Sequence, residues 1–551
     1  MMHFPMTLNW LCRLAERMYG TTEVVTKMPD GGFRRHSYAQ IAARSRRLAM
    51  RLAAENLKPG ETVGSLMWNH HVHLEAYFGV PAAGGVLHTI NHRLSPDDQV
   101  FIINHAKDKI LIVDDVLLPQ ILGILPRLDT VEKVIVNQYG LEDAAGFATY
   151  EAWLEEPVPS GVTLPEVGED SAASICYTGG STGRPKGVVY SHRGLVMHAF
   201  SQAMVDGYGV SRNDTVLAVV PMFHGNGWGL PFSCALTGAK LVLPGPKVDP
   251  QSLLALMQAE QVTFSAGVPT VWQELARSLE QATATATPAN LCPMTIITGG
   301  AAPPQHLFDR LERFGITLLQ GWGMTETASV ITVSRPEPRH NKAVDLVSGD
   351  WRLNQGKPMA IVDIRIVSEG NVLAHDGRSI GEVQVRGACV TDKYFELDLP
   401  GRWTEDGWLC TGDIGHIDPG GNLKVLERKE DLIKSGGEWI PPQDLEDALL
   451  ELPEVIECTV IGIPHEKWGE RPLALMVLAQ GATIEDEALR LHLLGRFAKW
   501  QLPQAFVAVA NIPRTAVGKI ARRQLREAYA DWPNRAAEAA RPSVLERARL
   551  I

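Results

Sequence analysis

Short apolar runs alternate with longer amphipathic runs along roughly the first 425 residues of the chain. Short apolar runs bounded by turn residues predict buried strands, and longer runs with apolar positions at helical spacing predict helices. We therefore expect an α/β fold with mainly parallel sheets flanked by helices. The expected strands are residues 61–68, 86–90, 109–113, 215–220, 240–243, 262–266, 294–298 and 316–319, and the expected helices are residues 73–83, 98–105, 250–259 and 270–280.

The pattern changes near residue 381, where the strand-like runs 382–386 and 423–426 indicate a β subdomain. A charged run, residues 427–431, then precedes a compact α+β stretch with helices at 442–451 and 486–497 and strands at 457–463 and 473–478. Charged runs are usually solvated faces, but the position of this one between two patterns indicates a hinge. Because 551 residues exceed one ordinary core, we predict a large domain, 1–427, and a small mobile domain, 428–551.

Composition narrows the class of protein. Hydrophobic residues make up 45% of the chain and charged residues 21%, as in an ordinary globular protein. The formal net charge of −11 argues against a nucleic-acid partner. The seven cysteines form no closely spaced pair, and no apolar run reaches the ~18 residues of a membrane helix. Residues 1–20 predict an amphipathic helix rather than a signal peptide, so we expect a cytoplasmic protein without integral membrane association.

The densest local feature is the loop 177–187, YTGGSTGRPKG, which follows a strand-like run. Glycines allow a backbone to approach a ligand closely, while hydroxyl groups and a lysine suit phosphate oxygens. The loop does not fit the GxxxxGK[ST] register of P-loop NTPases. A flexible surface loop is the plainer interpretation, but it does not account for this composition. The candidate phosphate-binding residues are Thr178, Gly179, Gly180, Ser181, Thr182, Gly183 and Lys186.

This loop resembles the signature of the adenylate-forming superfamily, which includes acyl-CoA synthetases, amino-acid adenylation domains and luciferases. One departure is Gly179, where the family commonly has Ser. Further motifs follow in the family's order over about residues 177–520, although each alone resembles an ordinary turn or loop. These motifs are residues 221–229 (PMFHGNGWG), 299–303 (GGAAP), 320–327 (QGWGMTET), 408–413 (WLCTGD), 435–439 (SGGEW) and 513–520 (PRTAVGKI).

The resemblance implies a nucleotide site. Glu326 is expected to hold Mg²⁺, which prefers hard oxygen ligands. Asp413 is expected to accept hydrogen bonds from the ribose hydroxyls, with Arg428 as a second ribose contact. Thr325 is expected to donate to the α-phosphate. The expected ATP- and AMP-binding residues, besides the phosphate loop, are Gly300, Ala301, Gln320, Gly321, Trp322, Gly323, Met324, Thr325, Asp413 and Arg428.

The same resemblance assigns the acyl pocket, the hinge and the path of coenzyme A. Lys519 is the expected adenylation lysine, and His224, Thr182 and Glu326 join it as catalytic candidates. Glu430 occupies the hinge position, where Asp or Lys is commoner. The expected acyl pocket comprises His224, Gly227, Trp228 and Gly299, and the expected hairpin along the CoA path comprises Ser435, Gly436, Gly437, Glu438 and Trp439.

Together these motifs predict an acid–thiol ligase that uses ATP, Mg²⁺ and coenzyme A. His224 follows Phe223 where amino-acid adenylation domains carry an amine-binding Asp, and no carrier-protein Gly-Gly-x-Ser motif follows Lys519. The bulk of Trp228 favours a short- or medium-chain acid, as in the medium-chain fatty acyl and methylthiopropionate CoA ligase branch. An aryl or alicyclic acid, another acceptor, and a catalytically silent nucleotide-binding scaffold remain alternatives. Homodimers occur in the family, and the sequence leaves the oligomeric state open.

Overall fold

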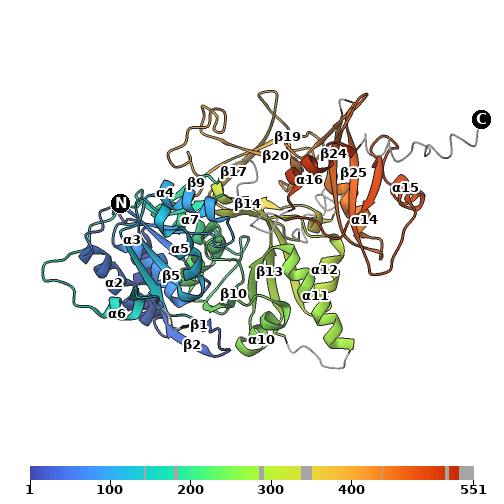
Figure 1. The fold of residues 1–551 in the computed structure, drawn as a ribbon. Helices are drawn as coiled ribbons and strands as arrows, with labels where there is room; N and C mark the ends of the chain where they lie inside the picture. The colour runs from blue at the N-terminus through green and yellow to red at the C-terminus, as the bar shows by residue number, and fades with distance from the viewer. Residues whose placement is uncertain are drawn as a thin grey trace, which may run out of the picture.

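The computed structural model describes residues 1–141, 144–178, 184–284, 291–336, 350–436, 438–514 and 520–532. The described chain has the predicted mixed α/β fold, with a large N-terminal part and a smaller C-terminal part. Figure 1 shows the N-terminal part in blue and green and the C-terminal part in orange and red at the opposite end of the molecule. Within the described residues, no helix is both long and apolar enough to cross a bilayer.

A seven-stranded sheet forms the first layer of the large part, in the order β7-β6-β5-β3-β4-β8-β9. All neighbouring strands are parallel except the last pair, so this sheet agrees with the prediction of mainly parallel strands. Its strands are β3 (Thr62–Leu66), β4 (Val86–Thr89), β5 (Asp108–Asp114), β6 (Lys133–Asn137), β7 (Ala148–Thr149), β8 (Ala172–Tyr177) and β9 (Gly187–Ser191). The associated helices are α2 (Tyr38–Ala54), α3 (His71–Ala82), α4 (Pro96–Ala106), α5 (Leu118–Ile124) and α6 (Tyr150–Glu155).

A nine-stranded sheet forms the second layer, in the order β16-β15-β14-β13-β12-β10-β11-β1-β2. Its central strands are parallel, while β2, β15 and β16 are antiparallel additions at the edges. The strands are β1 (Glu23–Lys27), β2 (Phe33–Ser37), β10 (Thr215–Ala218), β11 (Lys240–Leu243), β12 (Phe264–Gly267), β13 (Met294–Thr298), β14 (Ile316–Met324), β15 (Ser329–Val333) and β16 (Lys357–Pro358). The helices are α1 (Leu8–Tyr19), α7 (His192–Ala203), α8 (Gly225–Trp228), α9 (Leu230–Thr237), α10 (Pro250–Glu260), α11 (Pro269–Ala284) and α12 (Gln305–Glu312).

The helices begin where side chains satisfy backbone N–H groups that have no helical partner. The Ser37 hydroxyl accepts from the backbone N–H of Gln40, and the Gln40 side chain accepts from the Ser37 N–H, forming a capping box for α2. Asp249 caps α10 by accepting from the Ser252 N–H at 3.0 Å, and Pro250 occupies the first turn. The predicted N-terminal amphipathic helix is α1, whose buried face carries Leu8 and Leu11.

An antiparallel five-stranded sheet, in the order β18-β17-β19-β20-β21, is the predicted β subdomain. It lies beside the second sheet, and Figure 1 shows β19 and β20 reaching toward the C-terminal part. Its last strand, β21, ends at Arg428, next to the predicted hinge. The strands are β17 (Val362–Ser368), β18 (Asn371–Val372), β19 (Gly381–Gly387), β20 (Leu409–Ile417) and β21 (Leu423–Arg428).

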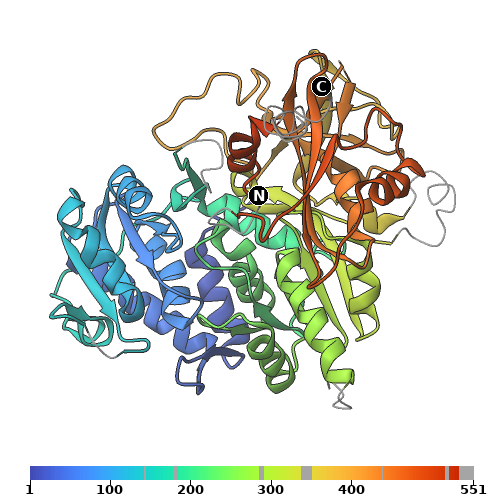
Figure 2. The same cartoon turned by 45° about the vertical axis from the view of Figure 1, so that its right-hand side comes forward.

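The C-terminal part has its own sheet and its own apolar core. The sheet order is β23-β22-β25-β24, and β26 pairs in parallel with β25. Figure 2 shows this part seated over the end of the second sheet. The domain boundary after residue 427 stays a prediction. The elements are β22 (Ile433–Ser435), β23 (Glu438–Ile440), α14 (Pro442–Leu450), β24 (Val455–His465), β25 (Gly469–Leu478), α15 (Asp486–Leu494), β26 (Ala505–Ala508) and α16 (Arg522–Tyr529).

Candidate active site

A cavity of about 800 Å³ lies between the second sheet, the antiparallel sheet and the C-terminal part. It opens at the carboxyl ends of β10, β12, β13 and β14, which is where ligands bind in parallel α/β sheets. Most of the predicted motifs contribute to its wall. The predicted site residues that line it are Thr178, Lys186, His224, Trp228, Gly300, Ala301, Gln320, Gly321, Trp322, Gly323, Met324, Thr325, Glu326, Asp413, Arg428 and Glu430.

Two ends of the phosphate loop meet at this wall. The backbone N–H of Thr178 donates to the carbonyl of Lys186 at 2.9 Å, and the Lys186 N–H donates to the Thr178 hydroxyl at 3.1 Å. These bonds hold the base of the loop at the cavity. The predicted residues Gly179, Gly180, Ser181, Thr182 and Gly183 lie outside the described residues, so their phosphate contacts remain predictions.

Glu326 is buried and carries contacts that sequence reasoning missed. The Tyr394 hydroxyl donates to Glu326 Oε1, and the Arg402 guanidinium lies 3.1 Å from the same oxygen. Burial and the Glu326 carboxylate raise the pKa of Tyr394. The Lys186 ammonium lies 5.7 Å from the centre of the Tyr394 ring. The carboxylate therefore lies among cationic and phenolic groups.

These contacts bear on the predicted magnesium site. Tyr394 and Arg402 both contact Oε1 of the Glu326 carboxylate, so Oε2 is the oxygen that would face a cation. Among the described residues, no group of three His, Cys, Asp or Glu side chains could hold a metal ion. The donor set fits Mg²⁺ bound by one carboxylate together with substrate phosphates, and it does not fit a cage built by the protein alone.

Asp413 and Arg428 meet across neighbouring strands, as the predicted ribose site requires. They are paired residues of β20 and β21, and Arg428 Nε lies 2.6 Å from Asp413 Oδ1. The Trp322 indole N–H donates to the other carboxylate oxygen at 2.8 Å, and Arg428 also donates to the Thr411 carbonyl. The Asp413 charge raises the pKa of Arg428. The pair is thus fixed from both sides before any ribose arrives.

The predicted acyl motif forms a left-handed turn. Five consecutive residues, 225–229, have positive φ, and two of them, Asn226 (39°) and Trp228 (51°), are not glycine. Asn226 is held by a bond from the Cys176 thiol and by donation to the Ser174 hydroxyl at 2.6 Å. Gln202 donates to the Trp228 carbonyl at 2.7 Å. A backbone in this region is strained for side-chain residues, so these bonds position the indole.

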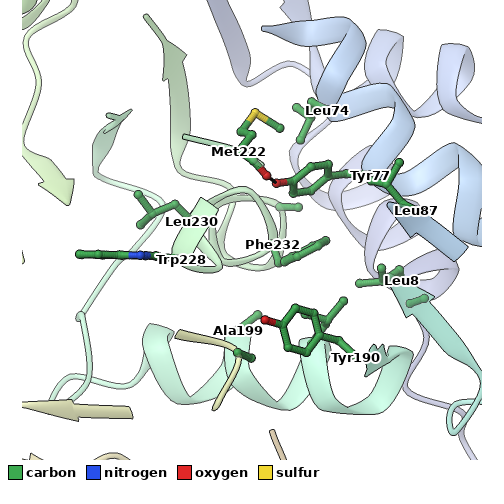
Figure 3. Packing of buried hydrophobic residues seen from close by; sticks show 14 of the residues in the cluster. Leu8, Leu74, Tyr77, Leu87, Tyr190, Ala199, Met222, Trp228, Leu230 and Phe232 are labelled. Carbon is green, nitrogen blue, oxygen red and sulfur yellow. Dashed lines mark hydrogen bonds between the residues drawn. The ribbon is translucent and has the colours of Figure 1, made fainter. Parts of the chain in front are cut away.

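The indole of Trp228 is buried as part of the large apolar core and also lines the cavity. In Figure 3 its ring points away from Tyr77 and Phe232, which pack on the other side of the same segment. A Cβ added at Gly299 would lie 3.4 Å from the Trp228 ring and 2.8 Å from the Gly321 carbonyl, so only glycine fits there. Gly299 and Gly227 therefore lie behind the cavity lining that His224 and Trp228 form.

The C-terminal part presents one side to the cavity. Arg514 and Ile520 flank residues 515–519 in the sequence, and both line the cavity. Lys519 itself lies outside the described residues. Glu430 also lines the cavity, where desolvation and Asp431 raise its pKa.

The predicted CoA hairpin lies elsewhere. Ser435 and Glu438 are paired across β22 and β23, and Gly437 lies outside the described residues. Of the hairpin residues that the structure describes, none lines the cavity; Gly436 contacts Trp468, and the Trp439 side chain is 49% exposed. Arg514 and Ile520 thus line the cavity, whereas the described hairpin residues do not.

Residues 13–395 match the AMP-binding enzyme family, and residues 444–519 match the AMP-binding enzyme C-terminal domain. The chain therefore belongs to the AMP-binding enzyme family, as its motifs predicted. The 3-methylmercaptopropionyl-CoA ligase of Ruegeria pomeroyi is 40% identical over 538 residues, which cover 96% of this chain and 98% of that protein. The long-chain-fatty-acid–CoA ligase of Thermus thermophilus is 43% identical and covers 94% of each chain.

A solved structure agrees with this assignment. The O-succinylbenzoate coenzyme A synthetase of Bacillus subtilis, in complex with ATP and a magnesium ion, superposes with a TM-score of 0.77 at 27% identity. The match covers 94% of this chain and 99% of that chain. The likeness to the methylthiopropionate branch that the sequence predicted is confirmed by the Ruegeria protein.

Proposed function

We propose that this protein is an ATP-dependent acyl-CoA ligase that converts a short- or medium-chain carboxylic acid into its acyl-CoA through an acyl-adenylate. Both curated relatives described above are CoA ligases over nearly the full length of this chain. The observation that carries the proposal is one continuous cavity lined by Lys186, Glu326, Asp413 and Trp228. A cavity that combines cationic, proposed ribose-binding and apolar groups can hold ATP and the acyl chain of an acid side by side.

The first half-reaction is attack by the acid's carboxylate on the α-phosphorus of ATP. The new O–P bond forms the acyl-adenylate as the bond to pyrophosphate breaks, so catalysis needs mainly positioning and charge stabilisation. Asp413 and Arg428 would orient the ribose, and Lys186 would neutralise phosphate oxygens. Lys519 would stabilise the charge between carboxylate and phosphate. Thr182 would contact the phosphates, and His224 would contact the acyl group.

Mg²⁺ held by Glu326 and the phosphates would withdraw charge from the polyphosphate. Arg402 and Tyr394 hold the Glu326 carboxylate in one orientation. Orientation by neighbouring groups commonly tunes a metal-binding carboxylate.

The second half-reaction would transfer the acyl group to the thiolate of coenzyme A. The new C–S bond forms at the acyl carbon, and AMP leaves with the electrons of the broken C–O bond. We propose that the domain of residues 428–551 rotates about Glu430 between the steps, because the Lys519 segment and the hairpin cannot occupy the same place. Hinge rotation of this kind is a common way to complete a site in two stages.

The relatives' names include both a 3-methylmercaptopropionyl and a long-chain fatty acyl group, so they do not define the acid for this chain. We favour short and medium chains because the bulky Trp228 lines the cavity and its backbone is bonded to Gln202. A bulky ring at the end of a pocket excludes longer chains.

The test is a panel of acids assayed for AMP release with and without coenzyme A. The panel runs from propionate and methylthiopropionate through octanoate to palmitate, with benzoate and cyclohexane carboxylate added. The proposal is supported if AMP release requires CoA and is highest for acids of about three to eight carbons, because the indole limits the length of the chain. Release that needs no CoA, or that peaks with palmitate or benzoate, contradicts it.

A further inference from the structure

Arg522, the first residue of α16, lies between two carboxylates from different parts of the fold. Its Nη1 is 2.9 Å from Glu427 Oε2 on β21, and its Nη2 is 2.8 Å from Glu446 Oε1 on α14. The side chains are 17%, 8% and 9% exposed for Arg522, Glu427 and Glu446. A largely buried guanidinium therefore connects the C-terminal part to the last strand of the antiparallel sheet.

The two ion pairs of Arg522, which we call the arms of this cluster, connect different parts of the fold. Glu446 is fixed inside the C-terminal part, where it also accepts from the Thr459 hydroxyl at 3.1 Å and the Val460 N–H at 2.7 Å on β24. Glu427 is paired with Ile414 of β20 on the other side of the predicted hinge. Only the Arg522–Glu427 arm crosses between the two parts.

The Arg522–Glu427 ion pair joins two segments that carry residues proposed for adenylation. Glu427 directly precedes Arg428, which pairs with Asp413. Arg522 comes three residues after Lys519 in the sequence, and Ile520 between them lines the cavity. An ion pair at this place links the strand that carries the ribose pair to the segment that carries the expected adenylation lysine.

We propose that Arg522 and Glu427 form an interdomain latch that positions the C-terminal domain for adenylation and must open for transfer to coenzyme A. The inference rests on the proposed two-step ligase function. When the latch opens, Arg522 keeps its pair with Glu446, which moves with it. Glu427 stays behind on β21 and loses its partner. Because a buried charge without a partner is costly, the latch favours one domain arrangement over the other.

The charges around Glu427 make the latch sensitive to pH. Burial raises the pKa of Glu427 to about 7; Glu446 and Asp431 also raise it, while Arg522 and the Arg428 N–H lower it. The ionised carboxylate pairs with Arg522, so the latch is strongest above this pKa and weakens as the pH falls through it. Opening removes Arg522, which raises the pKa of Glu427 further and leads it to take up a proton.

The decisive variant is Glu427→Gln, which removes the crossing charge and leaves the Arg522–Glu446 pair in place. Adenylation is followed as acid-dependent exchange of pyrophosphate into ATP, and transfer is followed as acyl-CoA formation from supplied acyl-AMP. We expect adenylation to fall by about tenfold, within the usual coupling energy of contacting charges, while transfer stays equal or becomes faster. Equal losses in both half-reactions, or no loss in adenylation, overturn the latch.

Arg523→Gln is the matched control for Arg522→Gln, because Arg523 neighbours Arg522 on α16 but is 64% exposed and pairs with Glu527 at the surface. It removes the same positive charge as Arg522→Gln and is expected to leave both half-reactions unchanged. The dependence of the adenylation rate on pH distinguishes a role of Glu427 in positioning the domain from a role in stabilising the fold. Wild-type adenylation should lose rate as the pH falls through about 7, and Glu427→Gln should lack this limb. An identical limb in the variant contradicts the latch.

Arg522→Gln and the double variant complete the test. If the latch exists, adding Glu427→Gln to Arg522→Gln costs adenylation little more, whereas full additivity overturns it. Should Arg522→Gln not fold, the Glu427→Gln comparison and its pH profile decide alone. The proposed function fails separately, if no acid supports pyrophosphate exchange in the wild type.

Discussion

The guanidinium of Arg402 lies 3.1 Å from the carboxylate of Glu326, although 76 residues separate them in the chain. Arg402 follows the antiparallel strand β19, whereas Glu326 follows the parallel strand β14. Their contact joins the two sheets at the place where the polyphosphate of ATP is expected. The Tyr394 hydroxyl bonds to the same carboxylate, so the orientation of the proposed metal ligand depends on both sheets.

Replacing Arg402 should therefore damage adenylation through Glu326. We expect Arg402→Ala to lower kcat/KM for ATP by about 10–100-fold, because a partly buried carboxylate loses its charged partner. The Mg²⁺ concentration for half-maximal exchange should change as well. Arg386→Ala is the control, since Arg386 belongs to the same antiparallel sheet but pairs with Asp363 at the surface. Equal kinetics of the two variants would rule out this role for Arg402.

Replacing Asp413 tests the ribose pair. Asp413→Asn keeps the shape of the side chain but leaves Arg428 without its ion pair, so we expect KM for ATP to rise by about tenfold or more. The acid's KM should change far less, because the ribose lies away from the acyl end. Asp363→Asn removes a surface carboxylate of the same sheet and should have no effect. A rise in both KM values by the same factor would contradict a role of Asp413 confined to the ribose.

Replacing Trp228 tests the choice of acid. Trp228→Ala should lengthen the pocket. We expect it to raise the ratio of kcat/KM for palmitate to kcat/KM for octanoate by about tenfold, which corresponds to the free energy of burying a few methylene groups. Trp500→Ala serves as the control, because this indole is 42% exposed and does not line the cavity. The measurement is the chain-length profile of CoA-dependent AMP release. An unshifted profile in Trp228→Ala would remove this residue from the specificity argument.

Lys519 and Gly437 lie outside the described residues, and their roles can be tested by separating the half-reactions. Lys519→Ala should abolish pyrophosphate exchange and leave transfer from supplied acyl-AMP mostly intact, because it removes charge stabilisation from the first step alone. Gly437→Leu should do the reverse by obstructing the path of coenzyme A. If either variant reduced both steps equally, the assigned division of labour would be wrong.

Sequence patterns predicted the features that depend on neighbours along the chain. The strand β14 and the motif 320–327 that ends it share one stretch, so apolar spacing and glycines indicated both. The roles of Asp413 and Arg428 came from the family resemblance alone, and their pairing across β20 and β21 is a finding of the structure. The match to a known family supplied the order of the motifs.

Contacts between distant elements could not be predicted in this way. Nothing near Arg402 or Tyr394 indicates that they approach Glu326, because the approach depends on how two sheets pack. The same holds for Arg522 and Glu427, because α16 packs against β24 and reaches β21 through this ion pair. Residues 225, 227 and 229 are glycines and Asn226 also tolerates positive φ, but tryptophan rarely adopts it, so the left-handed turn at Trp228 could not be predicted from the sequence.

Because of that left-handed turn, a substitution of Trp228 by glycine has two opposite effects on stability. Positive φ strains a tryptophan backbone but suits glycine, so Trp228→Gly relieves strain while it opens the pocket. Part of the packing energy lost with the indole is thereby offset. A tryptophan codon becomes a glycine codon by one base change, TGG to GGG. If Trp228 limits the acyl pocket, a broader range of acids lies a single nucleotide away, at a cost in stability that the relieved strain reduces.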